Sequence, residues 1–170
     1  NMALSPRQPG SAIKPLTFLA AFEKGWTPST LMWDVPTEYP PSSDPNDTNP
    51  DYVPSNYDGR FHGPVTLRAA LANSYNIPAV DAMQYVGIYA DPDTGREGGF
   101  IGLAKRLGIT SLTRSDYWLA LALGGGEMPL LELSSAFSTL ANNGLRVPTV
   151  AITRITDFSG NVIYEHHTVP

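Results

Sequence analysis

The stretch GSAIKPLTFLAAFEKG, residues 10–25, places one lysine, Lys14, in a run of apolar and small side chains. Residues 11–22 contain no other charged side chain, and no acidic residue precedes Glu23. The residue types favour a helix from Ser11 to Lys24 that ends at Gly25. The uncharged surroundings predict that the Lys14 amine is buried, which raises the question of what it does there.

Ser11 and Lys14 are three residues apart, so on a helix they would share a face. Ser11 would lie at the N-terminal end, where unpaired N–H groups and the helix dipole favour negative charge on a reacting oxygen. Burial lowers the pKa of a lysine, so a neutral Lys14 amine could accept the serine proton. Pro15 has no N–H and cannot bond back to the Ser11 carbonyl. Spacing alone leaves an ordinary helix start with a solvent-reaching lysine open.

A second candidate is NSYN, residues 73–76, at the junction of two predicted helices. Ser74 could relay a proton to or from Lys14 or a leaving amine. The carboxamide of Asn76 could hold an amide-bearing substrate and fix the lysine through its carbonyl oxygen. Serine and asparagine are also favoured helix caps, so a purely structural role remains open for both residues.

Composition limits the classes of protein that are compatible with the chain. Its 170 residues fit one domain, 42% are hydrophobic, and 16 prolines with 15 glycines predict many loops. A net charge of −5 and the lack of a basic cluster argue against nucleic acid as a partner. The absence of cysteine excludes disulfides and thiolate chemistry. No apolar run approaches a membrane span and no signal peptide is visible, but because Asn1 is the first residue, we expect the chain to be cut from something longer.

The pattern along the chain predicts a mostly helical α+β domain over residues 1–170. A long, proline-rich and mostly irregular segment covers residues 26–63, and a β-hairpin broken by FSGN covers 149–166. The clearest amphipathic helix places Leu130, Leu133, Phe137, Leu140 and Ala141 on one face. That helix covers residues 128–144, and further helices are predicted at 63–76, 77–87, 100–108 and 115–126.

Three other features have ordinary structural interpretations. His62 in RFHGP is predicted to be a loop histidine before a helix, because no cysteine or second histidine lies near it in sequence. GGGE, residues 124–127, lacks the lysine of a phosphate loop and is predicted to be a helix C-cap and turn. Asp44, Asp47 and Asp51 lack the spacing of a calcium loop and are predicted to be solvated.

Taken together, the motifs resemble a known family. S-x-x-K followed by S-x-N is part of the signature of penicillin-binding proteins and serine β-lactamases. RQPGSAIKPLTFLAAFEKG (7–25), YVPSNYDGRFHGPVTLRAALANSYNIPAV (52–80) and ALGGGEMPLLELSSAFSTLANNG (122–144) resemble the transpeptidase domain of bifunctional, class A penicillin-binding proteins. These long segments are far more specific than the two tetrapeptides.

The resemblance implies a peptidoglycan D,D-transpeptidase that cross-links stem peptides and is acylated by β-lactams. Ser11 would be the nucleophile, Lys14 its general base, Ser74 the proton relay and Asn76 the substrate-holding amide. No metal or organic cofactor is implied. The parent protein would be membrane-anchored, with an upstream glycosyltransferase domain, and would work on the extracytoplasmic face of the bacterial membrane.

The third family motif, K-[ST]-G, is absent, since none of Lys14, Lys24 and Lys105 begins such a triplet. We therefore expect a fragment that lacks that strand and, on its own, most of the activity. Two alternatives stay open: a non-catalytic module that binds β-lactams, peptidoglycan or a partner, and a serine β-lactamase. The latter needs a deacylating glutamate, for which Glu97 and Glu127 are the candidates.

Overall fold

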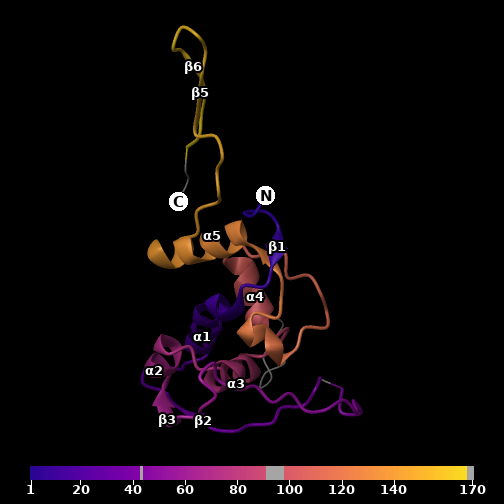
Figure 1. Ribbon diagram of the computed structural model, residues 1–170. Helices are drawn as coiled ribbons and strands as arrows, with labels where there is room; N and C mark the ends of the chain where they lie inside the picture. Colours follow the sequence, from indigo (N-terminus) through magenta and orange to yellow (C-terminus); the bar gives the residue numbers. More distant parts are fainter. Residues whose placement is uncertain (43, 91–97, 168–170) are drawn as a thin grey trace.

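The first helical segment lies at the centre of the fold. In the computed structural model, which describes residues 1–42, 44–90 and 98–167, the 3₁₀ turn η1 (Gly10–Ile13) leads into helix α1 (Lys14–Glu23). Helix α1 packs against α3 (Ile77–Val86), α4 (Gly99–Arg106) and the 3₁₀ turn η2 (Leu119–Leu123) (Figure 1). Because α1 and α3 are apolar on most sides, both are buried, and their side chains form much of the core.

A two-stranded sheet stands beside these helices. Strand β2 (Leu31–Asp34) pairs antiparallel with β3 (Gly63–Thr66), from Leu31 opposite Thr66 to Asp34 opposite Gly63. The predicted helix 63–76 is therefore wrong in its first turn. Helix α2 (Leu67–Ala72) begins only after Thr66, whose side chain accepts a hydrogen bond from the Ala69 N–H.

The predicted helix 115–126 is reduced to the short turn η2. Trp118 has extended backbone angles, and the Tyr117 N–H donates to the Tyr89 hydroxyl at 2.6 Å. Just before η2, Arg114 and Asp116 form a local two-pronged ion pair, at 2.7 and 2.8 Å. Together with the contact to Tyr89, it holds the segment before η2 extended, in place of the helix that its sequence favours.

Segment 26–63 is less irregular than predicted. It contains β2, and an isolated antiparallel bridge joins Tyr39 to Tyr52. Tyr39 is almost fully buried, and its hydroxyl donates to Asp81 of α3 at 2.5 Å. The segment is thus attached to the helical core part-way along its length, although much of it runs outside the body of the molecule (Figure 1).

Two very short strands bring distant parts of the chain together beside η1. Strand β1 (Pro6–Arg7) pairs antiparallel with β4 (Met128–Pro129), so the residues just before Ser11 lie against those just after the GGGE turn. The predicted cap is confirmed, because Gly124 ends η2 with a left-handed φ of 90°.

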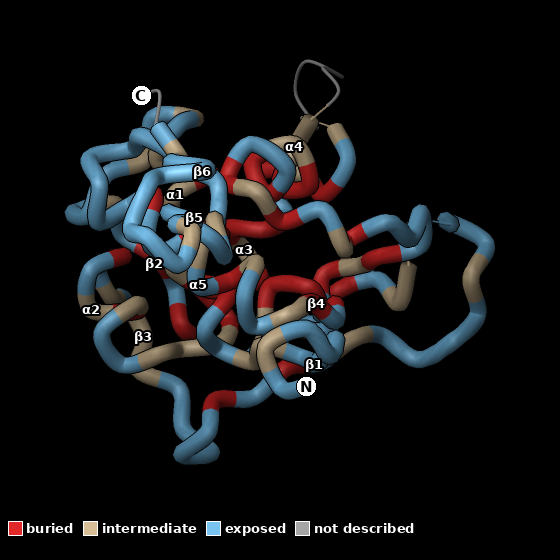
Figure 2. The backbone as a smooth tube through the Cα atoms, turned by 90° about the horizontal axis from the view of Figure 1, so that it is seen from above, coloured by how far each residue is buried: buried red, intermediate tan, exposed pale blue. Residues whose placement is uncertain are grey.

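The chain from Leu130 onward is more exposed than the part before it. Helix α5 (Leu130–Ala141) follows β4, and the predicted hairpin is confirmed as β5 (Arg154–Thr156) and β6 (Val162–Glu165). The hairpin projects away from the helices, and every residue of its two strands is exposed (Figures 1 and 2). In the described residues, no helix has the length and hydrophobicity needed to cross a bilayer. The whole has the mostly helical α+β architecture that the sequence predicts.

Candidate active site

The Lys14 amine meets the second motif directly. Lys14 is only 1% exposed, and its Nζ donates to Asn76 Oδ1 at 2.6 Å and to the Ser74 carbonyl oxygen at 2.5 Å. Ser74 Oγ lies 3.0 Å from the same nitrogen. Residues 60 or more positions apart in sequence therefore meet at one buried amine, so the structure brings Lys14, Ser74 and Asn76 together.

The environment of Lys14 suits a base. Burial lowers the pKa of Lys14 from 10.5 to about 8, because removal from water disfavours the ammonium form. A neutral amine has two hydrogens and one lone pair. Two carbonyl oxygens, of Ser74 and Asn76, can accept the hydrogens, while the Ser74 hydroxyl can turn its own proton toward the lone pair.

Ser74 is held in an unusual backbone conformation. Helix α2 ends in a Schellman motif, in which the Tyr75 N–H donates to the Ala70 carbonyl at 2.9 Å and the Ser74 N–H to the Leu71 carbonyl at 3.1 Å. Ser74 occupies the left-handed position that glycine usually takes, with φ of 57°. Ser74 therefore does take part in a helix cap, here at the C-terminal end of α2. In this conformation both its carbonyl oxygen and its hydroxyl face the Lys14 amine.

Asn76 begins α3 without capping it through its side chain. Its carbonyl oxygen accepts from the Ala79 and Val80 N–H groups at 3.1 and 3.0 Å, while its carboxamide makes no capping hydrogen bond. The carboxamide instead accepts from Lys14 and donates through Nδ2 to the Ser55 carbonyl at 2.6 Å. The Asn76 side chain therefore binds Lys14 and Ser55 instead of capping α3, although asparagine is a favoured capping residue.

Ser11 lies one turn before Lys14 and is exposed. Because Pro15 has no N–H to offer, the Ser11 carbonyl accepts from the Lys14 N–H, which makes the turn 3₁₀. Side chains three apart eclipse each other in a 3₁₀ turn, so Ser11 and Lys14 face the same side. Within the described residues the amine's hydrogen bonds go to Ser74 and Asn76, and none joins it to Ser11 Oγ.

The GGGE turn also supports the position of Ser11, which the sequence did not reveal. A β-carbon built on Gly124 would overlap the backbone of Gly10, the residue immediately before Ser11. Glycine is therefore required at residue 124 for close backbone approach as well as for its positive φ. The three consecutive glycines at residues 124–126 were the only feature of this turn in the sequence that could have indicated such a close approach.

His62 differs from its prediction. It precedes strand β3 rather than a helix, and its Nδ1 lies 2.7 Å from the buried carboxylate of Asp34. Its ring stacks on Tyr75, between the two residues of the second motif, with ring centroids 4.0 Å apart. The signal for this cluster was Asp34 itself, a lone carboxylate after the apolar residues of LMW.

Of the two candidates for a deacylating glutamate, Glu127 is the one that the structure describes, and it does not join this site. Glu127 is exposed and lines a separate cavity with Pro6, Gln8 and Arg114, and Glu97 lies outside the described residues. Among the residues that the structure describes, no three or more histidine, aspartate or glutamate side chains form a group that could hold a metal ion.

Comparisons with known proteins agree with this architecture. The family model described as the penicillin binding protein transpeptidase domain matches residues 1–170. Penicillin-binding protein 2D of Bacillus subtilis is 36% identical over 161 residues, which are 94% of this chain and 21% of that protein. Penicillin-binding protein 1A of Aquifex aeolicus is 37% identical over 161 residues, 94% of this chain and 20% of that protein.

Solved structures extend the likeness to three dimensions. The crystal structure of penicillin-binding protein 1A from Haemophilus influenzae covers 99% of this chain, which matches 23% of that one, with a TM-score of 0.81 and 32% identity. The structure of PonA1 from Mycobacterium tuberculosis matches 97% of this chain and 42% of its own length, with a TM-score of 0.77. Because the two sequences are only 20% identical, this match shows the fold alone. The chain spans about a fifth of the length of the curated relatives. Residues 1–170 belong to the penicillin-binding protein transpeptidase domain family.

Proposed function

We propose that residues 1–170 are the helical part of a peptidoglycan D,D-transpeptidase, with Ser11 as nucleophile, Lys14 as general base and Ser74 as proton relay. The observation that carries the proposal is the Lys14 amine, 1% exposed and within 3.0 Å of Ser74 Oγ. A buried amine with a pKa of about 8 accepts a proton far more readily near neutral pH than an ordinary lysine.

The proposed reaction uses these groups in two half-reactions. Ser11 Oγ bonds to the carbonyl carbon of the D-Ala–D-Ala amide while its proton passes to Lys14 Nζ. The C–N bond then breaks, and the leaving D-Ala amine takes a proton from the Ser74 hydroxyl, which recovers one from Lys14. In the second half, an acceptor amine attacks the Ser11 ester, its surplus proton passes to Lys14, and Ser11 Oγ leaves with that proton restored.

Asn76 has one carboxamide hydrogen committed to the Ser55 carbonyl oxygen. Its second Nδ2 hydrogen can donate to the carbonyl of a peptide lying along the site, which is the substrate-holding role that we propose for it. Its Oδ1 meanwhile stays on Lys14, so one side chain would link substrate position to base position.

We further propose that the K-[ST]-G strand lies outside residues 1–170 and supplies one wall of the cleft and an oxyanion donor. Peptidoglycan stem peptides and β-lactams would be the ligands. The complete protein would be membrane-anchored, with a glycosyltransferase domain, and would act on the extracytoplasmic face of the membrane. Names of relatives such as penicillin-binding protein 1A support this assignment.

A fluorescent penicillin tests the proposal in the complete protein that contains these residues. We expect stoichiometric covalent labelling, located at Ser11 by mass spectrometry of the labelled peptide, and no labelling in a Ser11→Ala variant. Reversible binding of equal strength in both forms, with no adduct in either, would favour a non-catalytic binding module. The isolated chain should label slowly, because positioning and oxyanion donors provide a large share of the rate.

A further inference from the structure

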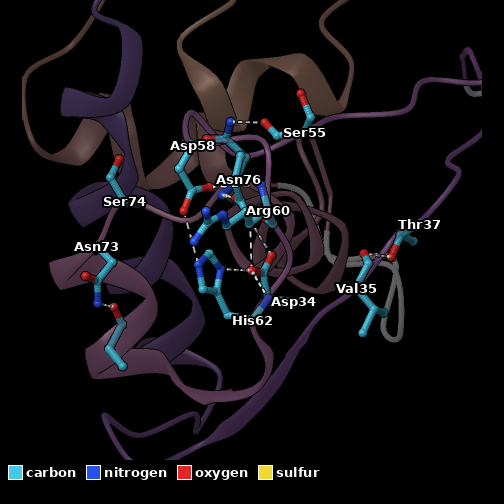
Figure 3. Close-up of polar contacts among 12 residues, drawn as sticks. Asp34, Val35, Thr37, Ser55, Asp58, Arg60, His62, Asn73, Ser74 and Asn76 are labelled. Carbon is cyan, nitrogen blue, oxygen red and sulfur yellow. Dashed lines mark hydrogen bonds and ion pairs between the residues drawn. The ribbon is translucent and has the colours of Figure 1, made fainter.

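We propose that Asn56, supported by the buried Asp34, is a positioning residue that sets where the Asn76 and Lys14 side chains stand during acylation. This inference rests on the proposed function, because it assigns a further residue to that same step. It also assigns a role to the long segment between β2 and β3, which contacts Asn76 of the second motif, residues 74–76, through Ser55 and Asn56 (Figure 3).

The cluster is built on a carboxylate that is fully removed from solvent. Asp34 is 0% exposed at the end of β2, opposite Gly63 of β3. Its oxygens accept from Asn56 Nδ2 at 2.9 and 2.8 Å and from the His62 N–H at 3.0 Å. A buried carboxylate without hydrogen-bond donors is strongly destabilising, so the loss of any of these donors would cost stability.

The contacts determine the orientation of the Asn56 carboxamide. Its Nδ2 donates to Asp34 and to the Arg60 carbonyl oxygen at 2.8 Å, neither of which can donate in return. Its Oδ1 must then face the other way, where it accepts from the Asn76 N–H at 2.7 Å. Asn56 itself is 5% exposed, so water has little access to replace these bonds.

Asn76 is consequently held at two points by adjacent residues. Asn56 Oδ1 fixes its backbone N–H, and the Ser55 carbonyl fixes its Nδ2 at 2.6 Å. With Nδ2 committed to Ser55, Oδ1 has to point toward Lys14. The chain of contacts from Asp34 through Asn56 and Asn76 therefore ends on the amine that we assign as the base.

His62 secures the same motif from a third direction. Its Nδ1 contacts Asp34, its Nε2 lies 3.2 Å from Asp58 Oδ2, and its ring lies on Tyr75 with an interplanar angle of 15°. Tyr75 joins Ser74 to Asn76, so the stack restrains the peptide that carries both functional side chains. Figure 3 shows His62 between Asp34 and Asp58.

The test compares Asn56→Ala with Asn73→Ala in the complete protein. Asn73 is a matched control, because it is the same residue type and directly precedes Ser74, yet it is exposed. Among the residues that the structure describes, its side chain donates only to the Ala69 carbonyl of its own helix. The acylation rate constant and the reversible dissociation constant for a fluorescent penicillin are measured separately, well below the melting temperature of each variant. We expect N56A to lower the rate constant roughly tenfold to hundredfold and N73A to leave it unchanged.

A merely structural role would lower the melting temperature of N56A without changing the rate constant of the folded protein, and that result would overturn the inference. A swapped pair gives a second test if N56A does not fold. Asn56→Asp alone sets two carboxylates against each other, whereas N56D combined with D34N restores a donor–acceptor pair between residues 34 and 56 and keeps an acceptor for the Asn76 N–H. The swap still loses the donor to the Arg60 carbonyl oxygen, so we expect it to acylate several-fold faster than N56D alone but more slowly than the wild type.

A swap that acylates as slowly as N56D alone, or fails to fold, would also count against the inference. The proposed function fails in a different way. An unlabelled wild type would overturn it and this inference together, whereas a wild type labelled at Ser11 beside an N56A variant that acylates equally fast would overturn this inference only.

Discussion

Apolar side chains are buried in the centre around Lys14, whereas many of them are exposed in the region from α5 onward. Ile13 at the end of η1 and Leu16 and Phe18 on α1 are all 0% exposed. On α5, Leu130 is 56% exposed and Phe137 37%, although both belong to the predicted apolar face. The site thus rests on packing that the chain supplies itself, whereas the apolar side chains of α5 and the hairpin remain largely in contact with solvent (Figure 2).

This difference shows what an amphipathic pattern can and cannot predict. Helix α5 has apolar residues on more than one stripe, and the fold buries the stripe of Leu133, Ala136 and Thr139. The neighbouring stripe, which includes Leu130 and Phe137, lines an open groove that Leu133 also borders. Periodicity predicts that a helix has an apolar face, but tertiary packing chooses which face is covered.

The largest expected effect is on the base in the buried centre. Lys14→Met keeps the bulk of the side chain and removes the amine, so we expect the acylation rate constant for a fluorescent penicillin to fall by roughly 10²–10⁴-fold. Lys105→Met, at an exposed position on α4, is the matched control and should acylate normally. Comparable rates for the two variants would contradict the assignment of Lys14.

The packing contrast is tested by one substitution made in both regions. Leu16→Ala opens a cavity at a fully buried position of α1 and should lower the free energy of unfolding by about 3 kcal/mol. Leu130→Ala removes an exposed side chain of α5 and should change it by less than about 0.5 kcal/mol. Urea denaturation of the two variants measures this. Equal losses would show that the α5 face is covered in solution.

Acylation should also depend on pH in the range where Lys14 titrates. The base must be neutral, and with a pKa of about 8 its neutral fraction rises as the pH rises toward that value. From pH 6 to pH 8 we expect the acylation rate constant to increase roughly fiftyfold and then to level off. The rate profile measured with a fluorescent penicillin tests this, and a flat profile across that interval would argue against an amine base.

The contact between Gly124 and Gly10 predicts a smaller and more local effect. Gly124→Ala and Gly144→Ala both place alanine at a positive φ, but only residue 124 has backbone within reach of a new β-carbon. We expect G124A to cost a further 1–3 kcal/mol or so of stability beyond G144A and to slow acylation about tenfold. Thermal melts and penicillin labelling measure the two effects. Equal behaviour would mean that the turn does not support Ser11.

The smallest effect concerns the backbone of Ser74. Ser74→Gly relieves the left-handed strain that Ser74→Ala retains, so the glycine variant should be more stable by about 1 kcal/mol. Both variants lose the hydroxyl and should acylate equally slowly. A more stable alanine variant, found by thermal denaturation, would contradict the strained geometry at this residue.

Much of the site followed from the sequence because its groups are marked by local pattern. The uncharged run around Lys14 predicted a buried amine, and the resemblance of the long segments to a known family joined that amine to Ser74 and Asn76. The supporting residues were not predictable in this way. Asn56 and Asp34 are 22 positions apart, and their side chains meet beside the paired strands β2 and β3. That pairing was missed because Gly63 and Pro64 resemble the start of a helix.

The fold was predicted with a similar limit. Helices α1, α3 and α4 and the hairpin follow periodicity and caps, whereas η2 does not. Its flanking residues 115–118 have helix-compatible types, but the hydrogen bond from Tyr117 to Tyr89 overrides that preference. Contacts with residues far away in sequence decide such segments, and no local window contains them.

The most direct test of the central claim is the pKa of Lys14 itself, measured in the complete protein by NMR titration of lysines labelled at the ε position, with Lys14→Met used to assign the signal. The structure predicts a pKa of about 8, lowered by burial against Ser74 and Asn76. A pKa of 10.5, the ordinary value, would show a hydrated ammonium group and would contradict the account of Lys14 as the base.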